Sequence, residues 1–91
     1  MHMHFVFSPE KNEWLQQERG VSFEEVIEIL ETLWPLSDEL HSNTERYPNQ
    51  RMFCIEIRGY VYRIPYVTDG EVSFLKTIYP SRFDTKQFLS P

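Results

Sequence analysis

The segment from Phe74 to Thr85 holds the residues of this chain that are best suited to chemistry. It reads Phe-Leu-Lys-Thr-Ile-Tyr-Pro-Ser-Arg-Phe-Asp-Thr, and its cations, phenol and hydroxyls are Lys76, Thr77, Tyr79, Ser81 and Arg82. Cations neutralise phosphate charge, and phenol or hydroxyl groups can hydrogen-bond phosphate oxygens. The segment therefore predicts a site that grips a phosphodiester where a strand breaks at Pro80. The alternative interpretation is that these cations are surface charges that pair with carboxylates.

The preceding strand, from Tyr60 to Val67, adds aromatic and cationic side chains to this candidate site. Because alternate side chains of a strand face opposite sides, Tyr62 lies on one face and Arg63 on the other. Stacking rings and cations suit unpaired RNA bases, so Tyr62, Arg63 and Ser81 are candidate RNA-binding residues. The alternative is that the tyrosines fill the edge of a core and keep their hydroxyls in water.

Most standard catalytic motifs are missing from the sequence. It has no phosphate-binding glycine loop, no Cys-x-x-Cys pair and no His-Glu-x-x-His, so we expect no metal and no cofactor. His41 is the one histidine outside the Met-His-Met-His start, which we expect to be solvated rather than metal-binding. It could reach a site as an acid or base, although a lone loop histidine is usually only solvated.

Charge is distributed unevenly along the chain. Residues 1–50 carry three Lys/Arg against ten Asp/Glu, whereas residues 51–91 carry six against four, giving a net charge of −5. We expect the first half, notably Glu24, Glu28 and Glu31 on one helix face, to attract a basic partner. The alternative is an acidic face that is simply solvated. We expect a polyanion to dock only on the second half.

Length and composition predict one domain that spans residues 1–91. The single Cys54 cannot form an internal disulfide, which suits a reducing cytoplasm. Apolar runs are short and the N-terminus lacks the features of a signal peptide, so we expect no membrane span and a cytoplasmic protein.

Two helices are predicted in the first half. Ser8-Pro9-Glu10 is typical of a helix start, and Gly20 of a helix end. Ser22 and Glu25 match a capping box for a second helix, whose apolar residues recur with the 3.6-residue period until Pro35.

Strand patterns account for most of the remainder. A short strand is predicted at residues 4–7, one more is possible at 36–40, and a meander follows at 51–57, 60–67 and 72–78. Asp84 or Thr85 is expected to cap a last short helix. The predicted fold is α+β, with two N-terminal helices on one face of an antiparallel sheet and a short C-terminal helix. The expected core is Trp14, Phe23, Val26, Ile27, Leu30, Phe53, Ile55, Ile57 and Phe74.

Four segments, in order, carry a resemblance to a known family. They are Ser8-Pro9-Glu10-Lys11, Glu18-Arg19-Gly20-Val21-Ser22-Phe23-Glu24-Glu25-Val26, Ile57-Arg58-Gly59-Tyr60-Val61-Tyr62 and Lys76-Thr77-Ile78-Tyr79-Pro80-Ser81-Arg82. With them the chain, from Phe5 to about Phe88, resembles the BrnT-type toxins of the RelE/ParE-like group of toxin–antitoxin ribonucleases. The Gly-Val-Ser-Phe-Glu-Glu joint between two helices is the most specific piece.

That resemblance implies a metal-independent endoribonuclease that blocks translation. In this chemistry the RNA's 2′-hydroxyl attacks the adjacent phosphorus, and the protein supplies proton transfer and cations. Arg82 matches the family's arginine after the last strand and is the first catalytic candidate. Lys76 and Tyr79 follow, as charge stabiliser and proton-transfer group.

The resemblance also implies a cognate antitoxin of the basic ribbon-helix-helix type, with DNA contacted only through that antitoxin. Two features depart from the family: relatives tend to continue with a basic residue where this chain has Phe83-Asp84, and this chain is acidic. A second hypothesis is therefore a non-catalytic interaction module that binds a DNA-binding antitoxin and modulates repression of their operon.

Overall fold

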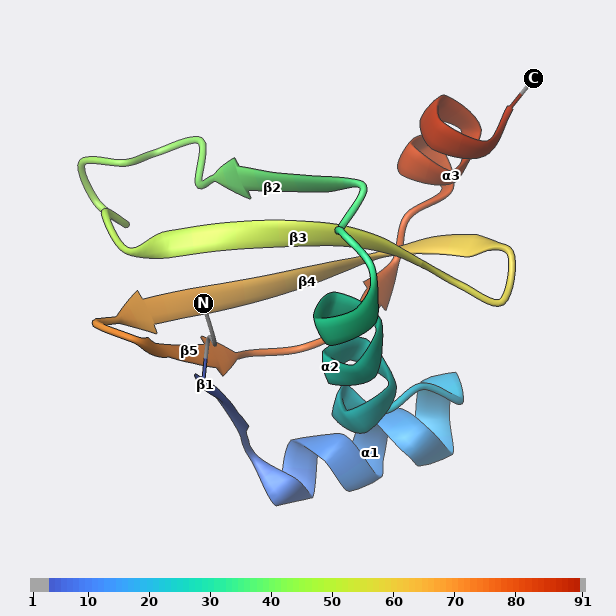
Figure 1. Ribbon diagram of the computed structural model, residues 1–91, viewed down its shortest axis with the longest axis horizontal. Helices are drawn as coiled ribbons and strands as arrows, with labels where there is room; N and C mark the ends of the chain where they lie inside the picture. Colours follow the sequence, from blue (N-terminus) through green and yellow to red (C-terminus); the bar gives the residue numbers. More distant parts are fainter. Residues whose placement is uncertain (1–3, 91) are drawn as a thin grey trace.

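The structure, a computed structural model, describes residues 4–90 as three helices and a six-stranded sheet (Figure 1). In chain order the elements are β1 (His4–Phe7), α1 (Pro9–Arg19), α2 (Phe23–Thr32), β2 (Ser37–Leu40), β3 (Gln50–Ile57), β4 (Tyr60–Asp69), β5 (Val72–Leu75), β6 (Tyr79–Pro80) and α3 (Arg82–Leu89). The predicted α+β class is confirmed. The expectation for the first three residues of the Met-His-Met-His start lies outside the described residues.

The sheet has the strand order β1-β5-β4-β3-β2, and β6 pairs with β4 beyond the end of β5. β1 runs parallel to β5, and all other pairs are antiparallel. The meander, the N-terminal strand and the possible strand before the polar loop are all present. The predicted strand at 72–78 is wrong in extent, because the chain leaves β5 after Leu75 and pairs with β4 again only at Tyr79.

The helix boundaries follow the capping signals of the sequence. Ser8 accepts a hydrogen bond from the backbone N–H of Lys11, and Gly20 ends α1 with a φ of +66°, a left-handed conformation that glycine adopts without strain. Ser22 and Glu25 form the predicted capping box at the start of α2. The helix ends at Thr32, before Pro35, because Leu33 already has an extended backbone.

Asn12 fixes the angle between the two N-terminal helices. Its side-chain oxygen accepts the backbone N–H of Phe23 at 2.7 Å, and its amide nitrogen donates to Glu24 at 2.7 Å. Because Asn12 is buried, these bonds satisfy polar groups that have little access to water. One side chain of α1 therefore caps the start of α2.

The core lies between the helices α1 and α2 and the sheet face that carries Phe53, Ile64 and Tyr66, which we call the inner face (Figure 1). Phe53 stacks on Tyr66 with ring centroids 4.0 Å apart. Of the predicted core, the buried members are Phe23, Val26, Phe53, Ile55 and Ile57. Ile27 and Leu30 are only partly buried and pack against this cluster.

The core prediction is wrong for Trp14 and Phe74, because each side chain is 41% exposed. α1 buries Leu15 instead of Trp14, and the indole ring lies on the surface under Lys11. β5 turns Leu75 inward, opposite Tyr66, so Phe74 must face outward.

The C-terminal helix begins differently from the prediction. Ser81, rather than Asp84 or Thr85, caps α3 by accepting the backbone N–H of Asp84 at 3.1 Å. α3 packs near the β3–β4 hairpin (Figure 1), where Thr85 accepts the backbone N–H of Val61 at 2.9 Å. Within residues 4–90, no helix is long and apolar enough to cross a membrane.

Candidate active site

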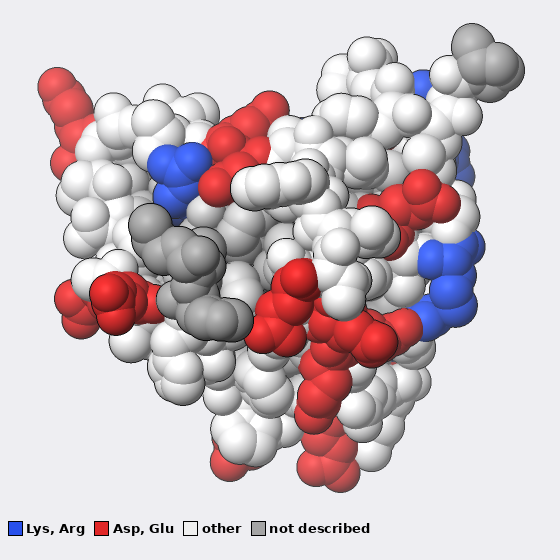
Figure 2. Space-filling view, viewed as in Figure 1, with Lys and Arg blue, Asp and Glu red and all other residues white. Residues whose placement is uncertain are grey.

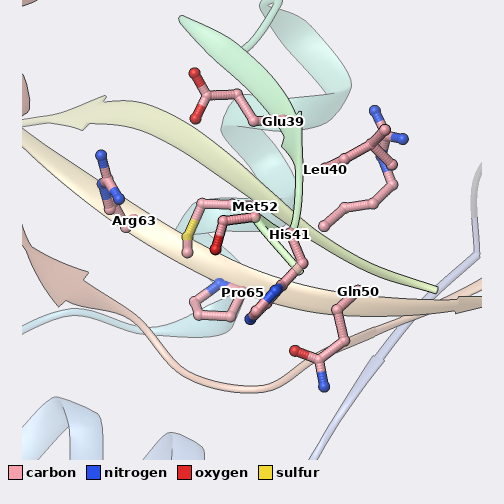
Figure 3. Close-up of a pocket in the computed structure, with 9 residues that line it drawn as sticks. Glu39, Leu40, His41, Gln50, Met52, Arg63 and Pro65 are labelled. Carbon is pink, nitrogen blue, oxygen red and sulfur yellow. The ribbon is translucent and has the colours of Figure 1, made fainter. Parts of the chain in front are cut away.

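The sheet face opposite the core, which we call the outer face, carries a shallow groove. Strand alternation turns Met52, Arg63 and Pro65 to this side, because their neighbours Phe53 and Ile64 point into the core. The groove lies beside the end of β2 and across β3 and β4 (Figure 3). Its ionisable lining residues are Glu39, His41, Arg63 and Arg51, the last paired with Asp38, and its floor includes Met52 and Pro65.

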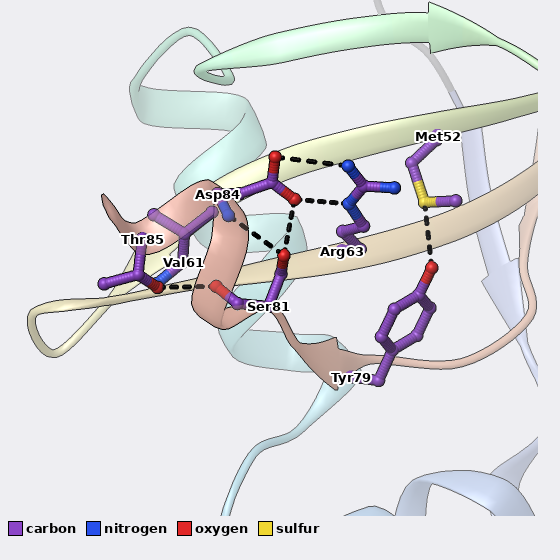
Figure 4. A network of polar contacts seen from close by, with 7 residues as sticks. All are labelled: Met52, Val61, Arg63, Tyr79, Ser81, Asp84 and Thr85. Atoms are coloured by element: carbon purple, nitrogen blue, oxygen red, sulfur yellow. Dashed lines mark hydrogen bonds and ion pairs between the residues drawn. The ribbon is translucent and has the colours of Figure 1, made fainter. Parts of the chain in front are cut away.

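An ion pair between Arg63 and Asp84 joins the groove to the start of α3 (Figure 4). Both carboxylate oxygens of Asp84 accept from Arg63: Oδ2 from Nε, and Oδ1 from Nη2 at 3.1 Å. Ser81 donates its hydroxyl hydrogen to the same Oδ2 at 2.6 Å. The two-point geometry holds the guanidinium in one orientation at the edge of the groove.

Both members of this pair are charged near neutral pH. The hydrogen bond to Asp84 raises the pKa of Arg63, although burial acts in the opposite direction. The hydrogen bond from Arg63 lowers the pKa of Asp84 below its usual range, and Ser81 adds to that effect against the cost of burial. Asp84 therefore offsets the single positive charge of Arg63, and the pair is close to neutral overall.

The lowered pKa of Asp84 predicts a specific loss of stability in acid. A carboxyl whose pKa falls on folding stabilises the protein fully above its unfolded pKa, and that contribution disappears as pH drops through the folded pKa. We expect the free energy of unfolding of the parent to exceed that of Asp84→Asn by a constant amount above about pH 5, and the gap to narrow below about pH 4. Urea unfolding at a series of pH values measures it.

Asp69→Asn is the matched control for this measurement, because Asp69 is exposed and forms no ion pair among the described residues. A gap between the parent and Asp84→Asn that stays constant down to about pH 2 would contradict the assignment of the ion pair.

Tyr79 adds a phenol next to the guanidinium. β6 pairs Tyr79 with Arg63, and the tyrosine hydroxyl contributes to the raised pKa of Arg63. The same hydroxyl lies 3.9 Å from the sulfur of Met52 on the groove floor (Figure 4). Because sulfur is a weak acceptor, this hydroxyl can easily exchange its partner for a phosphate oxygen.

His41 stands at the groove end opposite Arg63 (Figure 3). Its ring packs on Tyr47 with centroids 4.5 Å apart, and its Nδ1 accepts the backbone N–H of Asn43 at 2.9 Å. A nitrogen that accepts a hydrogen bond carries no proton, so in the neutral ring the hydrogen is on Nε2. His41 therefore offers an N–H donor from a fixed ring.

The structure brings together three of the residues predicted from the sequence: Arg63, Tyr79 and Ser81. Lys76 is exposed, and its backbone N–H bonds to the carbonyl of Pro65 at 2.8 Å, which places it beside the groove floor. Arg82 is the exposed first residue of α3, directly after Ser81.

Tyr62 does not join this group. It lies on the inner face opposite Ile55, packs against the core and meets Tyr60 edge-on. The period-two prediction that separates Tyr62 from Arg63 is thus confirmed.

The sequence did not predict that Asp84 pairs with Arg63 or that Glu39 lines the groove. Asp84 is 21 residues from Arg63, and the sequence marked it only as a candidate helix cap and as part of the departure from the family. Glu39 was expected only as part of a possible strand. The sequence signal at Asp84 is the Ser-x-x-Asp pattern after Pro80, which is typical of a helix start and does not indicate an ion pair with Arg63.

Among residues 4–90, no cluster of His, Cys, Asp and Glu has the geometry of a metal site. Comparisons with family models, with curated proteins and with solved structures found no match to this chain.

Proposed function

We propose that this chain is a metal-independent endoribonuclease that acts as the toxin of a type II toxin–antitoxin system. The observation that supports it most is the outer-face groove, which a clamped guanidinium and an imidazole N–H line, with the Tyr79 phenol next to the Met52 sulfur of its floor. These groups can bind and polarise a phosphodiester without a metal. The resemblance to BrnT-type toxins supports the same activity.

The reaction that fits these groups is attack of the RNA 2′-hydroxyl on the adjacent phosphorus. The new 2′-oxygen–phosphorus bond forms as the bond to the 5′-oxygen breaks. Glu39 is the carboxylate in the groove lining and takes the 2′-hydroxyl proton, while Tyr79 gives a proton to the departing 5′-oxygen. The N–H groups of Arg63 that do not donate to Asp84 and the Nε2 hydrogen of His41 donate to the non-bridging oxygens, which carry the extra charge.

Lys76, next to the groove floor, and Arg82, at the start of α3, are exposed cations that would bind phosphates neighbouring the cleaved bond. An exposed side chain is not held in one orientation, so each acts mainly through binding rather than through the chemical step. The departure at Phe83-Asp84 adds no unpaired carboxylate to the site, because Asp84 forms an ion pair with Arg63.

Expression of the chain alone from an inducible promoter tests the proposal. We expect the parent chain to arrest growth and to cause decay of cellular RNA, and we expect both effects to be weaker with Arg82→Ala. Co-expression of a cognate basic antitoxin should restore normal growth. Because Arg82 is exposed, its loss should change the free energy of unfolding by less than about 1 kcal/mol, and circular dichroism checks the fold. Unimpaired growth and stable RNA with the parent chain would contradict the enzyme.

The second candidate, a non-catalytic interaction module, is favoured by one observation: large apolar side chains are exposed away from the groove, with Trp34 93% exposed. Such a module would bind a DNA-binding antitoxin and modulate repression of their operon. It predicts that the parent alone neither arrests growth nor cuts RNA, yet changes the affinity of the antitoxin for operator DNA.

A further inference from the structure

The connection between α2 and β2 exposes three apolar side chains within four residues. Leu33 is 66% exposed, Trp34 93% and Leu36 38%, and we call these three residues the Trp34 strip. Single apolar residues on a surface need no explanation, but a contiguous group with a nearly uncovered tryptophan is typical of a docking site. Tryptophan is also enriched among the residues that dominate binding energy at protein interfaces.

The surroundings of the Trp34 strip are strongly acidic. Residues 20–45 contain seven Asp and Glu and no Lys or Arg. The last turn of α2 has no basic residue, although the carbonyl end of a helix carries partial negative charge and favours cations. In Figure 2 acidic side chains gather at the centre of this face, whereas Lys and Arg show mainly as one group at the upper left and another at the right edge.

Among the described residues, two of these seven carboxylates pair with an internal cation and five do not. Glu25 pairs with Arg58, and Asp38 pairs with Arg51. Glu28 and Glu31 lie on the exposed side of α2, just before the strip, and neither forms an ion pair with a described residue. The strip is thus an apolar anchor beside uncompensated negative charge.

We propose that the Trp34 strip docks a basic amphipathic helix of a partner protein. The apolar side of that helix covers Trp34 and Leu33, and its Lys or Arg side chains lie against Glu28, Glu31 and the carbonyl end of α2. A second copy of this chain is a poor occupant, because its strip brings the same negative charge. The strip and His41 are at opposite ends of β2, so docking does not depend on RNA cleavage in the groove.

A synthetic peptide of about 18 residues, or five helical turns, tests this docking directly. It carries Leu on one face and Lys on the other with a fluorescent label, and anisotropy measures its affinity for the purified chain. We expect Trp34→Ala to weaken binding by roughly tenfold or more, because it removes the central anchor. Trp14→Ala is the matched control, since Trp14 is exposed but lies under basic rather than acidic side chains.

Charge variants form the second arm of the experiment. Replacing both Glu28 and Glu31 by Lys, or raising the salt concentration, should weaken binding of the peptide, and a peptide with Glu in place of Lys should not bind. Equal affinity of the parent and Trp34→Ala, or equal binding of the acidic peptide, would overturn the proposal. RNA cleavage by Trp34→Ala should equal that of the parent, which separates a failure of docking from a failure of the enzyme.

Discussion

Replacing Tyr79 by Phe is expected to slow RNA cleavage by about 100-fold or more, with little change in stability. The substitution removes one hydroxyl, and a positioned proton donor typically contributes this much to the rate. The hydroxyl's neighbours are the Met52 sulfur, 3.9 Å away, and Arg63. Loss of the contacts between the hydroxyl and these two groups should therefore change the free energy of unfolding by no more than about 1 kcal/mol. Initial rates on a labelled RNA measure the effect.

Tyr60→Phe is the matched control, because it removes a hydroxyl from β4, the strand that pairs with β6, but on the inner face of the sheet. We expect it to cleave RNA at the parental rate. If Tyr79→Phe and Tyr60→Phe both cleave as fast as the parent, Tyr79 has no role in proton transfer. If both are slow, the tyrosines act through the structure of the sheet.

The largest effect on stability is expected at Phe53. It is 4% exposed and stacks on Tyr66 in the centre of the inner face, so Phe53→Ala should lower the free energy of unfolding by about 3–5 kcal/mol. This is a large share of the stability of a small domain. Urea unfolding followed by circular dichroism measures it.

Phe74→Ala is the control for Phe53→Ala, because it deletes the same side chain from a surface position. Apart from a small change in strand propensity, Phe74→Ala should change the free energy of unfolding by no more than about 0.5 kcal/mol. If the two variants lose equal stability, Phe74 belongs to the core and the register of β5 must shift by one residue.

The helices could be predicted from the sequence because their signals are local. Ser8, Gly20, Ser22 and Glu25 each act within a few residues, and the structure has them as expected. Local signals do not decide which side chains of β5 face the core. Phe74 and Leu75 are both apolar, and only the pairing of Leu75 with Phe7 and Tyr66 decides which one turns inward.

The candidate site was predictable only in part. The cluster of Lys76, Tyr79 and Ser81 is visible because these residues are close in sequence. The ion pair of Arg63 with Asp84 is not, because it depends on α3 folding back onto β4. His41 reaches the groove only because β2 pairs with β3, and its backbone N–H bonds to the carbonyl of Gln50 at 2.9 Å.

The most direct test of RNA cleavage by the groove is the identity of the product ends. The purified chain is incubated with an RNA oligonucleotide, and with DNA of the same sequence, in the presence of EDTA. Mass spectrometry of the fragments should find 2′,3′-cyclic phosphate and 5′-hydroxyl ends from the RNA and no cleavage of the DNA, because the 2′-hydroxyl is the nucleophile. Fragments with 3′-hydroxyl and 5′-phosphate ends, or RNA that stays intact, would contradict the proposed function.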